Sequence, residues 1–260
     1  MRTMNKKFFI TLGLFLLCLS AQARETRFVQ VAEALYSSSD KKLVEMCVQD
    51  INTLKNVDFV VFSGDNIARA DKGDLKEFFD IVRGLNYPVY FVLGDRDVSK
   101  SKGLNKETYR EEALFNFGIR QSLSPNYVFK KNGIIFIVVD GAKEFVTAQN
   151  GYYKQDTLDW LDKKLLKYKK SKVVIIQHFP VIDGKVHERN TYKADLYKDV
   201  ISKHDNILAI VCGHFNENRE ENVDNVMHFI TPSYKSTKYY KIFDIPEEKD
   251  FVFTQLRRVE

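Results

Sequence analysis

Short apolar runs alternate with longer stretches of helical periodicity along most of the chain. The apolar runs predict strands buried on both faces at residues 28–32, 59–63, 89–93, 134–139, 173–177 and 208–212. Apolar positions spaced by about 3.6 residues predict helices at residues 41–54, 74–85, 108–117, 157–169 and 193–204. Such alternation indicates an α/β architecture with crossover connections between strands. An antiparallel tail is predicted from three later runs, at residues 225–231, 239–245 and 251–257.

One domain accounts for this pattern. The chain has 260 residues, 44% of them hydrophobic, which is enough to bury a substantial core. It contains no internal repeat, no low-complexity tract and no linker long enough to divide it. Cys47 and Cys212 are interpreted as two buried thiols, since nothing in their spacing indicates a disulfide. We expect a single domain over residues 24–260, after a leader of residues 1–23.

The first 23 residues have the order of a secretory signal peptide. Lys6 and Lys7 precede an apolar run at residues 8–19, and the segment ends in the small residues Ala21 and Ala23. An uncleaved membrane anchor is the alternative, but the run is shorter than the ~20 residues that cross a bilayer. We expect cleavage after Ala23, a secreted, periplasmic or cell-envelope location, and no membrane span in the mature chain.

Charge gives no reason to expect a nucleic-acid partner. The chain has 40 Lys and Arg against 35 Asp and Glu, and three of the basic residues, Arg2, Lys6 and Lys7, lie in the predicted leader. The mature chain would therefore have 37 basic and 35 acidic residues. A nearly neutral domain lacks the strong positive field that attracts nucleic acid.

Polar residues that could do chemistry follow four of the predicted strands. Asp65 and Asp95 each come directly after a glycine that ends a strand, and His178 and His214 follow two later strands. A Gly-Asp pair is by itself typical of a turn, and a lone histidine is more often structural. In an open α/β sheet, however, ligands bind beyond the carboxyl ends of the strands, where these four side chains should converge. Two carboxylates and two imidazoles suit a divalent transition metal.

These positions follow in order the fingerprint of the calcineurin-like metallophosphoesterases, which the chain resembles. The fingerprint reads Asp-x-His, Gly-Asp, Gly-Asn-His-Asp or Glu, a His before a Pro, and Gly-His-x-His. The corresponding segments here are Glu33-Ala34-Leu35, Gly64-Asp65, Gly94-Asp95-Arg96-Asp97, His178-Phe179-Pro180 and Gly213-His214-Phe215-Asn216. The resemblance spans almost all of the mature chain and implies two packed mixed β-sheets flanked by helices.

The resemblance also implies a ligand set for two metal ions, of which only one set is complete here. It gives Asp65 the bridging position and assigns one ion to Asp95, His178 and His214 as well. The other ion would need the positions that hold the three residues Glu33, Leu35 and Asn216. Leucine cannot ligate a metal. Glu33 could still reach an ion with its longer side chain and Asn216 could offer its carbonyl oxygen, but this is a poor set for a transition metal. We therefore expect one divalent ion, Mn, Fe or Zn, per chain.

Arg96 and Asp97 are the candidate catalytic residues. Arg96 stands where the family has the histidine that meets the phosphate and assists the leaving group. Arginine can bind phosphate as a bidentate fork but, being permanently charged, is a poor general acid. The alternative interpretation is a salt bridge between Arg96 and Asp97.

Two functions remain open at this point. The first is an exported metal-dependent phosphoesterase that acts on a small phosphorylated substrate, a monoester or a diester. The second is a noncatalytic descendant that binds a ligand or a protein partner through the inherited cleft. The intact ligand set favours the first, and the residues Leu35 and Asn216 favour the second.

Overall fold

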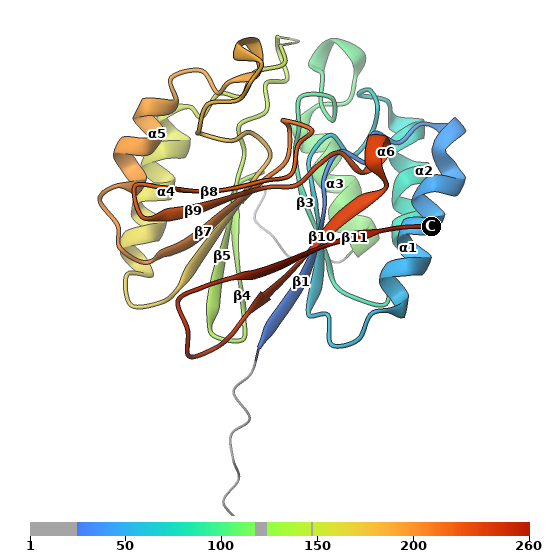
Figure 1. Cartoon of the computed structure of the whole chain (residues 1–260). Helices are drawn as coiled ribbons and strands as arrows, with labels where there is room; N and C mark the ends of the chain where they lie inside the picture. The colour runs from blue at the N-terminus through green and yellow to red at the C-terminus, as the bar shows by residue number, and fades with distance from the viewer. Residues whose placement is uncertain (1–24, 118–123, 147) are drawn as a thin grey trace, which may run out of the picture.

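The computed structural model describes residues 25–117, 124–146 and 148–260. Within them two mixed β-sheets pack face to face, with helices on the outer side of each sheet (Figure 1). This is the fold class predicted from the sequence, which is thereby confirmed. The predicted leader at residues 1–23 lies outside the described residues.

The first sheet has five strands, and the second has six. The order in the first sheet is β11 (Phe253–Arg258), β10 (Tyr239–Ile245), β1 (Thr26–Val31), β2 (Phe59–Ser63) and β3 (Val89–Val92). The order in the second is β4 (Tyr127–Lys131), β5 (Ile134–Val139), β6 (Val173–Gln177), β7 (Ile207–Cys212), β9 (Val226–Ile230) and β8 (Arg219–Val223). Strands β1 to β3 run parallel to one another, as do β5, β6, β7 and β9.

The helices lie in two groups on opposite outer sides. One group covers the five-stranded sheet and consists of α1 (Lys41–Thr53), α2 (Lys72–Val82) and α3 (Lys106–Phe117) (Figure 1). The other covers the six-stranded sheet and consists of α4 (Gln155–Lys167) and α5 (Ala194–Ile201) (Figure 1). Shorter helical turns are η1 (Ser38–Asp40), η2 (Lys100–Lys102), η3 (His187–Arg189) and α6 (Tyr234–Thr237). Among the described residues, no helix is long and apolar enough to cross a membrane.

Strand β2 is buried along its whole length because each of its faces meets a different layer. In β2, Phe59 and Val61 belong to the cluster between the two sheets, whereas Val60 and Phe62 belong to the cluster under the helices. Successive side chains of a strand point to opposite faces, so such a strand has no solvent face. Phe59 meets Phe136 of the other sheet edge to face, with 4.9 Å between ring centroids. Burying each such ring stabilises the fold by about 1.5–3 kcal/mol.

The predicted antiparallel tail is wrong in part. β10 and β11 pair antiparallel to each other, and β10 adds to β1 in the five-stranded sheet. β9 instead belongs to the six-stranded sheet, where it runs parallel to β7 and antiparallel to β8. The chain therefore changes sheets after β9, which apolar periodicity within a strand cannot reveal. The edge strands β4 and β8 were not predicted, because their burial alternates or is incomplete.

Candidate metal centre

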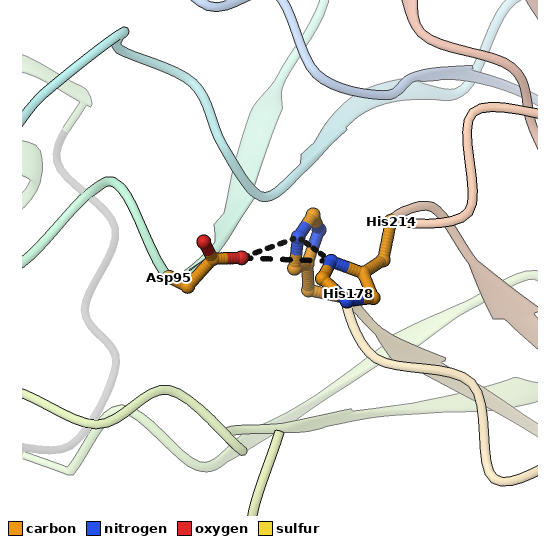
Figure 2. Close-up of side chains that lie close together, drawn as sticks. All are labelled: Asp95, His178 and His214. Carbon is orange, nitrogen blue, oxygen red and sulfur yellow. Dashed lines mark hydrogen bonds and ion pairs between the residues drawn. The ribbon is translucent and has the colours of Figure 1, made fainter. Parts of the chain in front are cut away.

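Three buried or half-buried side chains bring potential ligand atoms together at the carboxyl ends of the parallel strands. Asp95 follows β3, His178 follows β6 and His214 follows β7. Asp95 Oδ1 lies 3.7 Å from His178 Nε2 and 3.5 Å from His214 Nδ1 (Figure 2). The two ring nitrogens are 3.2 Å apart. One ligand atom from each residue lies within 4.8 Å of the others, which is close enough to share an ion.

Backbone carbonyl groups fix which ring nitrogen of each histidine faces the centre. His178 Nδ1 lies 2.8 Å from the carbonyl oxygen of Ser63, and His214 Nε2 lies 3.1 Å from that of Arg189. A carbonyl only accepts hydrogen bonds, so these two nitrogens carry the protons of the neutral rings. The lone pairs of His178 Nε2 and His214 Nδ1 then face each other and the buried Asp95 Oδ1, which has no hydrogen-bond partner. This donor set fits a cation, with the carbonyl groups as outer support for the ligands.

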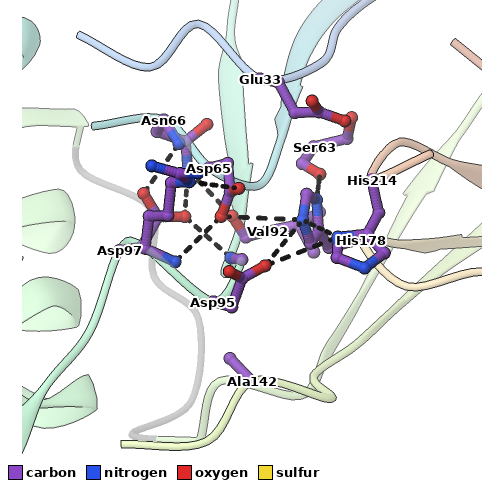
Figure 3. A network of polar contacts seen from close by, with 12 residues as sticks. Glu33, Ser63, Asp65, Asn66, Val92, Asp95, Asp97, Ala142, His178 and His214 are labelled. Atoms are coloured by element: carbon purple, nitrogen blue, oxygen red, sulfur yellow. Dashed lines mark hydrogen bonds and ion pairs between the residues drawn. The ribbon is translucent and has the colours of Figure 1, made fainter. Parts of the chain in front are cut away.

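Asp65 supplies a second carboxylate near the same ring nitrogen of His178. Its Oδ1 lies 3.7 Å from His178 Nε2 and accepts a hydrogen bond of 2.9 Å from the backbone N–H of Arg96 (Figure 3). The side chain of Arg96 also reaches Asp65, with Nε 3.5 Å from Oδ2. The ion-pair partner of Arg96 is thus Asp65 and not Asp97, unlike the salt bridge considered from the sequence.

Two glycines make this close approach possible. A Cβ at Gly94 would lie 2.2 Å from Asp65 Oδ1, and one at Gly64 would lie 2.4 Å from His178 Nδ1. Gly64 also has φ +95°, a conformation that side chains disfavour. The Gly-Asp pairs recognised in the sequence are therefore required by the packing of the loops against the ligands.

Asp97 is fully buried and holds the two loops together. Its Oδ1 accepts hydrogen bonds from the backbone N–H groups of Asn66 at 2.7 Å and Ile67 at 3.1 Å. Its Oδ2 accepts from the backbone N–H of Gly94 at 2.8 Å and the side-chain amide of Asn66 at 3.1 Å (Figure 3). These contacts assign it a positioning role, because both oxygens are already saturated by the loops that carry Asp65 and Asp95.

The positions expected to hold a second metal form a hydrogen-bonded network of their own. With the amide nitrogen of Asn216 facing Glu33, it donates to both carboxylate oxygens, at 3.1 Å to Oε1. The amide oxygen of Asn216 then accepts from Arg189 Nη1 at 3.1 Å. Glu33 is buried, and its oxygens are occupied by an amide rather than open to an ion. Together with Leu35, which has no donor atom, this set does not fit a second transition metal.

The buried carboxylates of the centre would be stabilised by an added positive charge. Burial raises the pKa of Glu33 to about 7 and the pKa of Asp65 to about 6. Burial opposes a charge on His178, but the neighbouring carboxylates of Asp65 and Asp95 raise its pKa to about 9. Buried carboxylates are stable when they are paired or coordinate a metal. When His178 is protonated, Nε2 carries the second proton instead of a lone pair. A metal cation at this nitrogen would replace that proton and satisfy the same carboxylates.

Strained backbone marks the loops of this centre. The φ angles are positive at Glu33 (52°), Leu35 (45°), Asp65 (52°), His214 (72°) and Asn216 (57°). Such conformations cost about 1–3 kcal/mol each in non-glycine residues and cluster at functional sites. Periodicity in the sequence carries no sign of them, and it gave no reason to single out the neighbouring Arg189.

Comparison with known proteins agrees with this geometry. The calcineurin-like phosphoesterase family profile matches residues 38–217. A probable glycerophosphodiester phosphodiesterase, GpdQ, of Arcobacter nitrofigilis is 26% identical over 199 residues, which are 74% of this chain and 70% of that protein.

Solved structures show the same fold at low identity. A dimetal phosphatase from Danio rerio superposes with a TM-score of 0.65 at 15% identity, covering 88% of this chain and 98% of that one. GAP50, the anchor in the inner membrane complex of Plasmodium, superposes with a TM-score of 0.56 at 14% identity, covering 91% and 89%. The family profile spans well over half of the sequence, and the candidate ligands Asp95, His178 and His214 lie together at the strand ends. The chain belongs to the calcineurin-like phosphoesterase family.

Proposed function

We propose that this protein is an exported metal-dependent phosphoesterase that holds one transition-metal ion per chain. The observation that carries the proposal is the meeting of two imidazole lone pairs and an unpartnered carboxylate oxygen at the ends of β3, β6 and β7. The similarity to the bacterial relative, a probable glycerophosphodiester phosphodiesterase, supports hydrolysis of phosphate esters.

The residues that would hold the ion are Asp95, His178 and His214, with Asp65 beside them. Imidazole nitrogen and carboxylate oxygen together suit Mn, Fe or Zn. An ion of this kind polarises a phosphoryl oxygen and makes water a stronger nucleophile at neutral pH. The chain itself keeps the ligands rigid, because backbone carbonyl groups orient both imidazole rings.

Arg96 would bind the oxygens of the phosphoryl group. Its side chain is 50% exposed, and its Nε is anchored 3.5 Å from Asp65 Oδ2. The planar guanidinium group binds phosphate oxygens in pairs and stabilises negative charge that develops on them. Since it stays protonated, Arg96 does not donate a proton to the leaving group.

We expect a single ion because the residues at the second metal position bond to one another. Glu33 shares its carboxylate with the amide of Asn216, and Arg189 brings a positive charge to the same network. The guanidinium group of Arg189 thus offsets part of the negative charge of Glu33 that a second metal ion would otherwise neutralise. Hydrolysis should accordingly lack the clamp on both attacking and leaving oxygens that two metals provide.

Metal content tests the proposal directly. Elemental analysis of the purified mature protein should find about one transition metal per chain, because the chain has one complete ligand set. The protein should hydrolyse bis-p-nitrophenyl phosphate or p-nitrophenyl phosphate when loaded with Mn, Fe or Zn. His178→Ala should lose most of the metal and the activity, whereas the control His204→Ala should keep both, because His204 pairs with Asp162 away from the centre. Full metal content in His178→Ala would overturn the assignment of the site.

A noncatalytic binding protein is the second candidate function. It is favoured by the hydrogen-bonded network of Glu33, Asn216 and Arg189 where a metal would otherwise bind. GAP50, the anchor in the inner membrane complex of Plasmodium, shares the fold. A metal-loaded protein that hydrolyses neither test ester with any of the three metals would favour this candidate over the enzyme.

Export is proposed from the order of residues in the first segment alone. A basic start, an apolar run at residues 8–19 and the small residues Ala21 and Ala23 support cleavage after Ala23. The intact mass of protein collected outside the cytoplasm should correspond to a chain that begins at Arg24. Material that still carries Met1 in that fraction would contradict the proposal.

A further inference from the structure

A cavity of about 250 Å³ opens next to the metal centre, on the side of Asp95 and Arg96. Both residues line it, so the cavity is continuous with the place where a phosphoryl group would bind. The remaining polar side chains around it come from the loops after β2 and β3 and from residue 149, and they are Arg69, Ser99, Lys102 and Gln149.

The lining of this cavity has an excess of positive charge. Three cations, Arg69, Arg96 and Lys102, face it together with the single carboxylate of Asp95. Arg69 contacts Asp74 through Nε at 3.5 Å, and its side chain is otherwise largely exposed, at 69%. In the described part of the chain, Lys102 forms no ion pair. Guanidinium and ammonium groups in this arrangement are typical of a site for an anion.

Size and composition also limit what the cavity can hold. Its volume lies below the roughly 300–1,000 Å³ of sites for drug-sized ligands. The apolar part of the lining consists of the small side chains Ala68, Ala70 and Val98. No lining residue that the structure describes is aromatic, so a nucleobase or another flat ring would have nothing to stack on. A short, charged group fits better than a large organic leaving group.

We propose that this cavity binds a second anionic group of the substrate. The preferred substrates are small phosphate esters that carry another phosphate or a carboxylate a few bonds from the scissile phosphorus. The inference rests on the proposed function, because it requires the scissile phosphoryl group to lie at the metal centre. Arg96 contacts both regions and would hold the substrate across the boundary between them.

Phosphonates that cannot be hydrolysed separate binding from turnover. The test ligands are 3-hydroxypropylphosphonate, 3-phosphonopropanoate and propane-1,3-bisphosphonate, which differ only in the group at the far end. Calorimetric titration of the metal-loaded protein should show at least tenfold tighter binding of a charged ligand than of the hydroxyl ligand, as expected for one charge-assisted contact. Comparing the carboxylate with the bisphosphonate identifies which anion the cavity prefers.

Variants of the lining residues test whether the cavity causes the preference for charged ligands. Lys102→Gln and Arg69→Gln should each remove most of the preference and leave binding of the hydroxyl ligand unchanged. Lys170→Gln, an exposed lysine that does not line the cavity, should keep the full preference. Equal binding of all three ligands, or a preference that survives in Lys102→Gln and Arg69→Gln, would overturn the proposal.

The corresponding phosphate esters then test the proposed function separately. Turnover with a lower KM and an unchanged kcat for the charged esters is the expected result. A binding preference without turnover of any ester would refute the phosphoesterase and leave the anion site standing. Turnover of all three esters with equal KM would support the phosphoesterase and refute the anion site.

Discussion

Asp97→Ala is expected to destabilise the whole fold, because this buried carboxylate joins the two loops that carry the metal ligands. The change would leave three buried backbone N–H groups without an acceptor, those of Asn66, Ile67 and Gly94. Each unsatisfied buried donor costs about 1–3 kcal/mol, and such costs are not fully additive. We expect a loss of about 3–5 kcal/mol in the free energy of unfolding, a large fraction of the ~5–15 kcal/mol of a typical domain.

Asp97→Asn is the matched control for this prediction. An amide keeps one oxygen that can accept from Asn66 and Ile67, but it turns an NH₂ group toward the N–H of Gly94. One lost acceptor predicts a smaller loss of about 1–3 kcal/mol. Urea unfolding followed by circular dichroism gives both values, and elemental analysis gives the metal content of each variant.

Comparing the stability and metal content of the two variants distinguishes a positioning role of Asp97 from a catalytic one. If Asp97 positions the loops, stability and metal content should fall together, further in the alanine variant than in the asparagine variant. If Asp97→Ala instead unfolds at the wild-type urea concentration, keeps its metal and loses only hydrolysis, the positioning role is refuted. The residue would then have a catalytic role, as its position in the sequence first suggested.

Two further changes test the incomplete ligand set and a distant ion pair. Leu35→His together with Asn216→His should raise metal content toward two ions per chain by elemental analysis, and an unchanged count in the folded double variant would show that ligand identity is not what limits the site. Asp50 accepts hydrogen bonds of 2.7 Å from both Nε and Nη2 of Arg257, and this pairing holds the pKa of Asp50 below its usual value although burial opposes it. The pairing stabilises the folded state above the unfolded carboxyl pKa of about 3.9 and is lost as pH falls through the lower folded value. Asp50→Asn should therefore lower stability at pH 7 by roughly 0.5–1 kcal/mol, allowing for solvent screening, and the difference should shrink in acid unfolding curves as pH falls below the unfolded carboxyl pKa of about 3.9.

The sequence was most informative for strands that are buried on both faces. The predicted bounds of β2, β5 and β6 agree with the structure, because every position of these strands is buried and nearly all of them are apolar. Their parallel arrangement also brings Asp95, His178 and His214 to one edge, as the strand-end argument predicted. The edge strands and the change of sheet after β9 depend on pairing between distant segments, which local periodicity does not encode.

The limits of the sequence are clearest in the segment around Leu35, where backbone and side chain give different information. A leucine there shows that a ligand is absent, but it says nothing about the conformation of the loop. The structure places the segment alongside the Asp65 loop, with the Leu35 N–H 2.9 Å from the carbonyl oxygen of Asp65 and the Tyr36 N–H 2.9 Å from that of Asn66. Leu35 has φ 45° there, which an apolar side chain does not favour and which the neighbouring hydrogen bonds must impose.

The loop around Leu35 is held by hydrogen bonds to the Asp65 loop, next to the incomplete second ligand set. The family profile begins only at residue 38, so the match itself does not cover the segment. Its backbone nevertheless remains bonded to the Asp65 loop, while Glu33 keeps a buried carboxylate a short distance away. For this reason the Leu35→His and Asn216→His variant tests the missing ligands on a loop whose conformation is already held in place.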